Sequence, residues 1–147
     1  MKHKNILFIF SISFLVILFD QLTKYIISHT FALSESITLI KNLLEITYIR
    51  NTGAGFGIFR GANIILIFTS LIIIGIILFY FDKILKEKPS HIPLALILGG
   101  AVGNLIDRLF LGHVIDFIYI RFWPAFNVAD SCISIGAVWL IIYYWKK

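Results

Sequence analysis

The stretch ANIILIFTSLIIIGIILFYF, residues 62–81, carries no charged side chain over 20 consecutive positions. An α-helix rises about 1.5 Å per residue, so a helix of this length reaches about 30 Å, the thickness of the hydrocarbon core of a bilayer. The whole chain fits a membrane protein, because 59% of its 147 residues are hydrophobic and 14% are charged, whereas about 25% are charged in soluble domains. We expect a single integral-membrane domain over residues 1–147.

Three further segments are apolar over most of their length: residues 6–19, residues 92–111 and residues 128–145. We therefore predict an all-α polytopic membrane protein with four transmembrane helices over about residues 6–29, 62–81, 92–111 and 128–145. Between the first two helices, residues 44–50 alternate apolar and polar side chains and residues 37–40 favour strands. This pattern predicts a small β-sheet within residues 30–61, lying on the membrane.

The net charge of +5 could indicate a nucleic-acid partner, but the basic residues follow a membrane topology instead. Seven of the 13 lie in the two tails and in the short segment 82–91: Lys2, Lys4, Lys83, Lys86, Lys88, Lys146 and Lys147. By the positive-inside rule both termini and this loop are cytoplasmic. No nucleic-acid partner is expected.

The N-terminal segment, with Lys2 and Lys4 before an apolar run, also looks like a secretory signal. No convincing small-x-small cleavage site follows that run, so we expect a retained first helix. The single cysteine, Cys132, excludes an internal disulfide and a cysteine-based metal cluster. Its neighbours do not resemble a lipid-attachment site.

Polar residues enter the outer part of the first predicted helix. Asp20 lies about 21 Å above Ile6 along a continuous helix, still within a hydrocarbon core about 30 Å thick. Lys24 follows four residues later on the same helical face, where it can pair with Asp20. This pair is either a structural anchor for the helix end or a direct contact to substrate.

The third predicted helix repeats this arrangement. Asn104 lies about 18 Å and Arg108 about 24 Å above Ile92, one turn apart on the same side, and Asp107 lies three residues from Asn104. The Gly-x-x-x-Gly spacing within residues 99–103 predicts close helix packing. At this depth in the membrane, the guanidinium of Arg108 requires a carboxylate partner or a polar cavity.

The apolar stretch VIDFIYIRFWPAFNVAD, residues 114–130, carries two carboxylates, Asp116 and Asp130. Asn127 and Asp130 open the fourth predicted helix with the spacing of an N-cap and its reciprocal partner, so capping alone can explain both. The same spacing places both side chains on one face. The two explanations remain open at this point.

With the N-terminus inside, several polar side chains converge at the outer face: Asp20, Asn51, Asn104, Arg108, Asp116, Asn127 and Asp130. Two carboxylates held close do not both ionise easily, so one can act as a base on water while the other donates a proton. This chemistry is peptide hydrolysis. The alternate glycines Gly53, Gly55 and Gly57 have no Walker or Rossmann spacing, and we interpret them as flexible backbone approached by a ligand or by another chain.

Other function classes fit less of the sequence. A small proton-coupled transporter predicts ionisable residues across the whole membrane depth, and a scaffold protein leaves Asp116 and Arg108 without a role. A serine–lysine dyad using Lys24 is a further alternative. The four histidines lack zinc-ligand spacing, so no metal and no cofactor are expected.

Four motifs resemble the bacterial lipoprotein signal peptidases, the type II signal peptidases. They are Asp20-Gln-x-Thr-Lys24, Asn51-x-Gly53-Ala, the glycine-rich run through Asn104-x-x-Asp107-Arg108 that continues to Asp116-Phe, and Phe126-Asn127-x-Ala-Asp130. The resemblance covers nearly the whole chain, with the motifs in the right order. Gly55 departs from it, since the family more often has alanine there.

The resemblance implies an aspartyl endopeptidase that cleaves the signal peptide from diacylglyceryl-modified prolipoproteins, before the lipidated cysteine. It implies a bacterial cytoplasmic (inner) membrane protein with its active site near the outer leaflet, a sheet cradle after the first helix, and inhibition by globomycin. Asp116 and Asp130 take the catalytic positions. Asn51, Gly53, Asn104, Arg108 and Asn127 take substrate-binding positions, while Asp20, Lys24 and Asp107 take structural ones. Membrane lipids are expected around a monomer.

Overall fold

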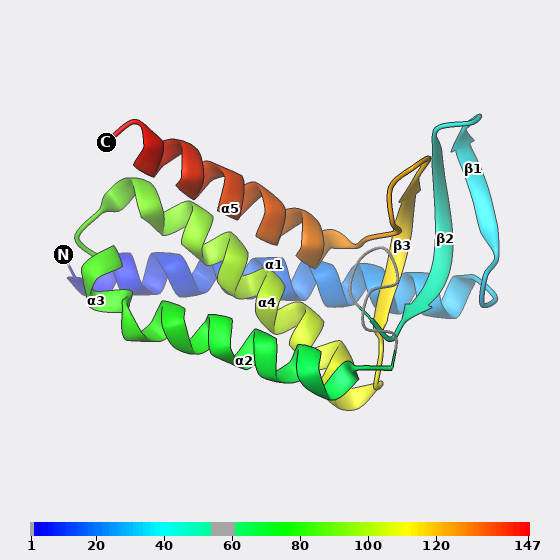
Figure 1. Cartoon of the computed structure of the whole chain (residues 1–147), viewed down its shortest axis with the longest axis horizontal. Coiled ribbons are helices and arrows are strands. Elements are labelled where there is room, and N and C mark those ends of the chain that lie inside the picture. Colours follow the sequence, from blue (N-terminus) through cyan, green and yellow to red (C-terminus); the bar gives the residue numbers. More distant parts are fainter. Residues whose placement is uncertain (1, 54–60) are drawn as a thin grey trace.

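The computed structural model describes residues 2–53 and 61–147. Its helices are α1 (Lys2–Thr30), α2 (Asn63–Phe79), α3 (Phe81–Ile84), the 3₁₀ turn η2 (Lys88–Ser90), α4 (His91–Phe110) and α5 (Val128–Trp145), and its strands are β1 (Ser36–Ile40), β2 (Leu44–Asn51) and β3 (Val114–Ile120). The four long helices form a bundle with both termini at one end, and the sheet stands across the opposite end (Figure 1).

Three of the described helices are long and apolar enough to cross a membrane: His3–Thr30, Lys88–Phe110 and Val128–Trp145. The remaining predicted span, the second helix over residues 62–81, is divided in the structure. The α2 helix has 17 residues and ends at Phe79, and the chain leaves it at Tyr80 before α3 begins with Phe81. The prediction therefore extended this helix too far at its C-terminal end.

Helix α4 is the centre of the bundle, because it packs against α1, α2 and α5. Its glycines allow the close approach that their spacing predicted. A Cβ on Gly99 would lie 2.7 Å from the Ser13 carbonyl oxygen of α1, and a Cβ on Gly100 would lie 2.5 Å from the Ala129 carbonyl oxygen of α5. Two neighbouring glycines thus let two helices contact the backbone of α4 on different sides.

The predicted sheet is present, but it has one strand more than expected. Its order is β1-β2-β3 with both pairs antiparallel, and β3 comes from the connection between α4 and α5. The register places Ile49 opposite Asp116 and Asn51 opposite Val114. The sequence prediction had assigned the sheet to residues 30–61 alone. The missed strand matters because it carries Asp116.

The chain returns from β3 to the bundle through a short backbone pairing. Phe126 donates its N–H to the Ile118 carbonyl at 3.0 Å, and its own carbonyl accepts the N–H groups of Phe117 and Ile118. This pairing delivers the next residue, Asn127, to the N-terminus of α5 beside β3.

Replacing Gly100 with alanine tests the close packing of α4 and α5. The added Cβ overlaps the Ala129 carbonyl, so we expect the folded protein to lose about 1–3 kcal/mol, the usual cost of overpacking. The measurement is the thermal midpoint in detergent micelles. Gly75→Ala in α2 is the matched control, because nothing lies within 4 Å of its Cβ position. Equal midpoints for the two variants would contradict the packing described here.

Candidate active site

Two carboxylates meet where the sheet joins the bundle. Asp116 lies in β3 and is buried, and Asp130 lies in the first turn of α5, where it is partly buried. Asn127 is the N-cap of α5, and it forms a capping box with Asp130 as predicted. In this motif the Asn127 Oδ1 atom accepts the Asp130 N–H at 2.9 Å, and the Asn127 N–H donates to Asp130 Oδ2 at 3.3 Å.

Capping leaves part of each side chain free for other contacts. The Nδ2 atom of Asn127 donates to Asp116 Oδ1 at 2.8 Å, so one asparagine contacts both carboxylates. The second oxygen of Asp130, Oδ1, accepts from Asn104 Nδ2 at 2.7 Å. The capping role and membership of a two-carboxylate site are therefore compatible, which the sequence had left open.

Asn51 holds Asp116 from the neighbouring strand. Its Nδ2 atom donates to Asp116 Oδ2 at 2.8 Å, while its Oδ1 atom accepts the Gly53 N–H at 2.9 Å. A backbone N–H only donates, so it fixes the Asn51 amide with its NH₂ group toward the carboxylate. The other glycines of this segment, Gly55 and Gly57, lie outside the described residues, and their predicted role remains a prediction.

A cavity of about 190 Å³ opens beside the two carboxylates. Arg108 lines it, so this guanidinium lies in a polar cavity, one of the two environments that its depth required. The cavity is lined by Asn51, Gly53, Arg108, Val114, Asp116, Trp123, Pro124, Ala125, Phe126 and Asp130. It is polar on the side of the aspartates and apolar along residues 123–126.

Burial dominates the electrostatics of Asp116. Burial first, and then repulsion from the Asp130 carboxylate, raise the pKa of Asp116 to about 7, against the N–H donors of Asn51 and Asn127, which lower it. A carboxyl group with a pKa near neutral can exist in either protonation state under physiological conditions. Such a group can donate a proton or accept one.

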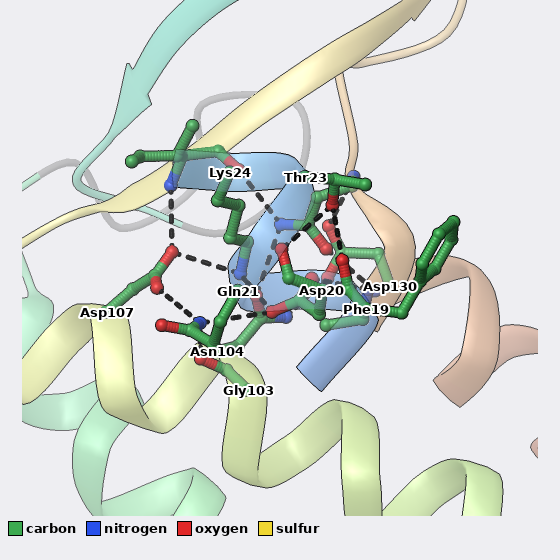
Figure 2. Close-up of polar contacts among 12 residues, drawn as sticks. Phe19, Asp20, Gln21, Thr23, Lys24, Gly103, Asn104, Asp107 and Asp130 are labelled. Atoms are coloured by element: carbon green, nitrogen blue, oxygen red, sulfur yellow. Dashed lines mark hydrogen bonds and ion pairs between the residues drawn. The ribbon is translucent and has the colours of Figure 1, made fainter. Parts of the chain in front are cut away.

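A second polar cluster borders the two carboxylates and is joined to Asp130 through Asn104. Lys24 of α1 pairs with Asp20 at 2.8 Å, as predicted, and also with Asp107 of α4 at 3.0 Å. Figure 2 shows the Lys24 side chain reaching from α1 toward Asp107 and Asn104. Lys24 Nζ donates to Asn104 Oδ1 at 3.0 Å. All three charged side chains of this cluster are buried.

Comparison with known proteins agrees with the family resemblance of the four sequence motifs. The sequence model of the family described as signal peptidase (SPase) II matches residues 12–146. The chain belongs to the signal peptidase II family.

Named relatives and solved structures match over nearly the full length. The lipoprotein signal peptidase of Halothermothrix orenii is 40% identical over 139 residues, which are 95% of this chain and 96% of that protein. The lipoprotein signal peptidase of Syntrophus aciditrophicus is 48% identical over 152 residues, covering 97% of this chain and 94% of that protein. A solved structure described as a bacterial membrane enzyme superposes with a TM-score of 0.87 at 36% identity, covering 98% of this chain and 88% of that one.

Membership of the signal peptidase II family makes this chain a peptidase and a multi-pass bacterial membrane protein. The family favours a peptidase over the transporter and the scaffold considered from the sequence. All the polar residues predicted to converge do lie at the sheet end of the bundle. Their individual roles in catalysis and binding remain predictions.

Sequence reasoning missed two parts of the candidate site in this member of the signal peptidase II family. The first is strand β3, although residues 114–120 are rich in β-branched and aromatic side chains and follow Gly112, which is a strand signal. The second is Gln21, whose Nε2 atom donates to Asp107 Oδ1 at 2.9 Å and to Asp20 Oδ2 at 3.2 Å. A glutamine between Asp20 and Lys24 in a membrane helix was the available signal.

The raised pKa of Asp116 predicts a carboxyl group that titrates near pH 7 in the folded protein. The infrared carbonyl band of a protonated carboxylic acid should fade around that pH and should be absent in Asp116→Asn. Because this pKa lies above the usual 3.8, protonation stabilises the fold as the pH falls below about 7.

Asn51→Ala removes a hydrogen-bond donor that favours the ionised form of Asp116. The carboxyl band of Asp116 in this variant should therefore fade at a higher pH than in the unmodified chain. Asn5→Ala, at the opposite end of α1, is the control and should leave the band unchanged. A band that behaves alike in both variants would contradict the assignment to Asp116.

Proposed function

We propose that this chain removes the signal peptide from diacylglyceryl-modified prolipoproteins and cleaves before the lipidated cysteine. The observation that carries the proposal is the pair Asp116 and Asp130, linked through Asn127 beside a cavity, in a chain of the signal peptidase II family. Relatives described as lipoprotein signal peptidases support the substrate class.

The proposed reaction is hydrolysis by an aspartate dyad. One carboxylate removes a proton from water, the water attacks the peptide carbonyl, and the protonated partner stabilises the tetrahedral intermediate and then protonates the leaving amine. The pKa of Asp116, raised to about 7, supports a dyad that shares one proton near neutral pH. Asn51, Gly53 and Arg108 line the same cavity and are proposed to orient the substrate backbone.

The proposed membrane placement has four crossings, with both termini in the cytoplasm. The 17 residues of α2 reach about 25 Å, near the lower limit for a spanning helix. The lysines of both tails and of residues 82–91 favour the cytoplasmic side for the end opposite the sheet. The sheet and the dyad then lie at the outer leaflet of the bacterial inner membrane.

This placement suits a lipid-modified substrate. The acyl chains can remain in the bilayer while the cleavage site reaches a water-accessible cavity at the bilayer boundary. Residues 123–126 form the apolar side of that cavity and are proposed to contact the substrate near its lipid. A globomycin-type inhibitor is proposed to occupy the same cavity. One copy of the chain supplies both aspartates, so a monomer is sufficient.

Asp116→Asn and Asp130→Asn test the dyad. Each change removes one carboxylate and keeps the size of the side chain, so we expect cleavage of a diacylglyceryl prolipoprotein to fall by about 100- to 10,000-fold, the usual contribution of a positioned acid or base. The measurement is the rate with purified protein in detergent or lipid. The thermal midpoint of each variant shows whether it is folded.

Asp82→Asn is the matched control, because Asp82 lies in α3 at the end of the bundle opposite the sheet. It should cleave at nearly the rate of the unmodified chain. Normal cleavage by a folded Asp116→Asn or Asp130→Asn variant would refute the proposed dyad.

A further inference from the structure

Each dyad aspartate directly follows a residue whose backbone N–H is held by a buried carboxylate. The Ile115 N–H, one residue before Asp116, donates to Asp107 Oδ2 at 3.1 Å. The Ala129 N–H, one residue before Asp130, donates to Asp20 Oδ1 at 2.9 Å. Two carboxylates outside the dyad thus bind the backbone immediately beside the two carboxylates within it.

One lysine joins these two anchoring carboxylates. Lys24 Nζ lies 2.8 Å from Asp20 Oδ2 and 3.0 Å from Asp107 Oδ2, and the side chains are 2%, 0% and 2% exposed. The three groups come from α1 and α4, while the N–H groups that they hold come from α5 and β3. Through these two carboxylates, the Lys24 ammonium group connects β3 and α5 to α1 and α4.

Lys24 also reaches Asp130 by a second route. Its ammonium has only donors, so it orients the Asn104 amide with Oδ1 toward itself and Nδ2 toward Asp130. Asn127 Nδ2 donates to the same Oδ1 atom at 3.1 Å, so two donors hold this orientation. Lys24 thus helps to set the direction of the hydrogen bond from Asn104 to Asp130, which it does not itself make.

We infer that Asp20, Lys24 and Asp107 are positioning residues that set the distance and orientation between Asp116 and Asp130. The inference rests on the proposed function and extends it, because it assigns a catalytic consequence to a cluster expected to be structural. The sharing of a proton between two carboxylates varies with their separation. A displacement of about 1 Å in an active site can lower a rate about 100-fold.

A role limited to anchoring helices makes a different prediction. An ion pair that only joins α1 to α4 stabilises the fold through its charges. Its loss should therefore lower the stability of the fold and leave kcat per folded molecule unchanged. The positioning role depends instead on the hydrogen bonds to the Ile115 and Ala129 N–H groups. A substitution that removes the charge and keeps the acceptor separates the two roles.

Asp107→Asn and Asp107→Leu form such a pair. Both remove the negative charge, but only asparagine retains an oxygen that can accept the Ile115 N–H. We expect kcat for a diacylglyceryl prolipoprotein to fall about 100-fold in Asp107→Leu and to stay within about tenfold in Asp107→Asn. KM should change little in either variant, because Asp107 does not line the cavity.

The pH profile of kcat gives a second readout. Both variants lose the same charge, and the other charged groups facing the dyad are unchanged: Asp20 and Lys24 of α1 and Arg108 of α4. A difference in profile between the two variants therefore reports the geometry of the dyad. We expect Asp107→Leu to displace the pH optimum relative to Asp107→Asn.

Ser13→Ala is the matched control for a buried polar contact that only joins α1 to α4. Its Oγ atom donates to the Ala95 carbonyl at 3.0 Å, and this contact holds neither β3 nor α5. Loss of this hydroxyl should lower the thermal midpoint while kcat per folded molecule stays within about threefold.

The outcomes separate this inference from the proposed function. Cleavage by the unmodified chain and its loss in Asp116→Asn test the function. Given both, equal kcat values and equal pH profiles for folded Asp107→Asn and Asp107→Leu overturn the positioning role alone. If Asp107→Leu does not fold, Asp107→Asn decides by itself, because a folded form with kcat reduced 100-fold or more overturns the assignment.

Discussion

The structure depends on one buried ammonium group, Lys24, held between Asp20 and Asp107. Charges taken out of water carry a large desolvation cost, which is offset only when each is paired and hydrogen-bonded. Here Asp20 also accepts a backbone N–H from α5, and Asp107 accepts one from β3. Removing one member of such a buried pair typically costs about 3–5 kcal/mol. The cluster therefore constrains the elements that carry the site.

The glycines of α4 make this arrangement geometrically possible. Because Gly99, Gly100 and Gly103 have no side chain, α1 and α5 approach the α4 backbone closely. A Cβ at Gly103 would lie 2.6 Å from Asp20 Oδ2, so this position gives room to a charged group rather than to an apolar one. Close helix packing and burial of the ion cluster are in this way the same structural feature.

Much of the candidate site was predictable because charged and amide side chains are costly in an apolar segment and therefore indicate pairing or function. Asp20, Asn104 and Arg108 were assigned to one level from helical rise, and Lys24 was assigned to the helical face of Asp20, where the structure pairs the two. The Asn127 and Asp130 capping box was also visible in the sequence. Strand β3 was not predicted although its composition favours a strand, since its residues pair with residues of β2 that lie 63 to 76 positions earlier in the chain, and local sequence does not specify such a pairing.

The sequence by itself determined that this is a membrane protein with its polar residues at one end, since uncharged helical runs and isolated charges are read from local order. It also determined the family, through four motifs spread along the chain. The tertiary structure decided which groups meet. Only folding shows that Asp107 holds the backbone before Asp116, that Asp20 holds the backbone before Asp130, and that Lys24 joins them. The physical reason is that hydrogen-bond partners depend on distances in space, which long-range packing sets and local sequence does not.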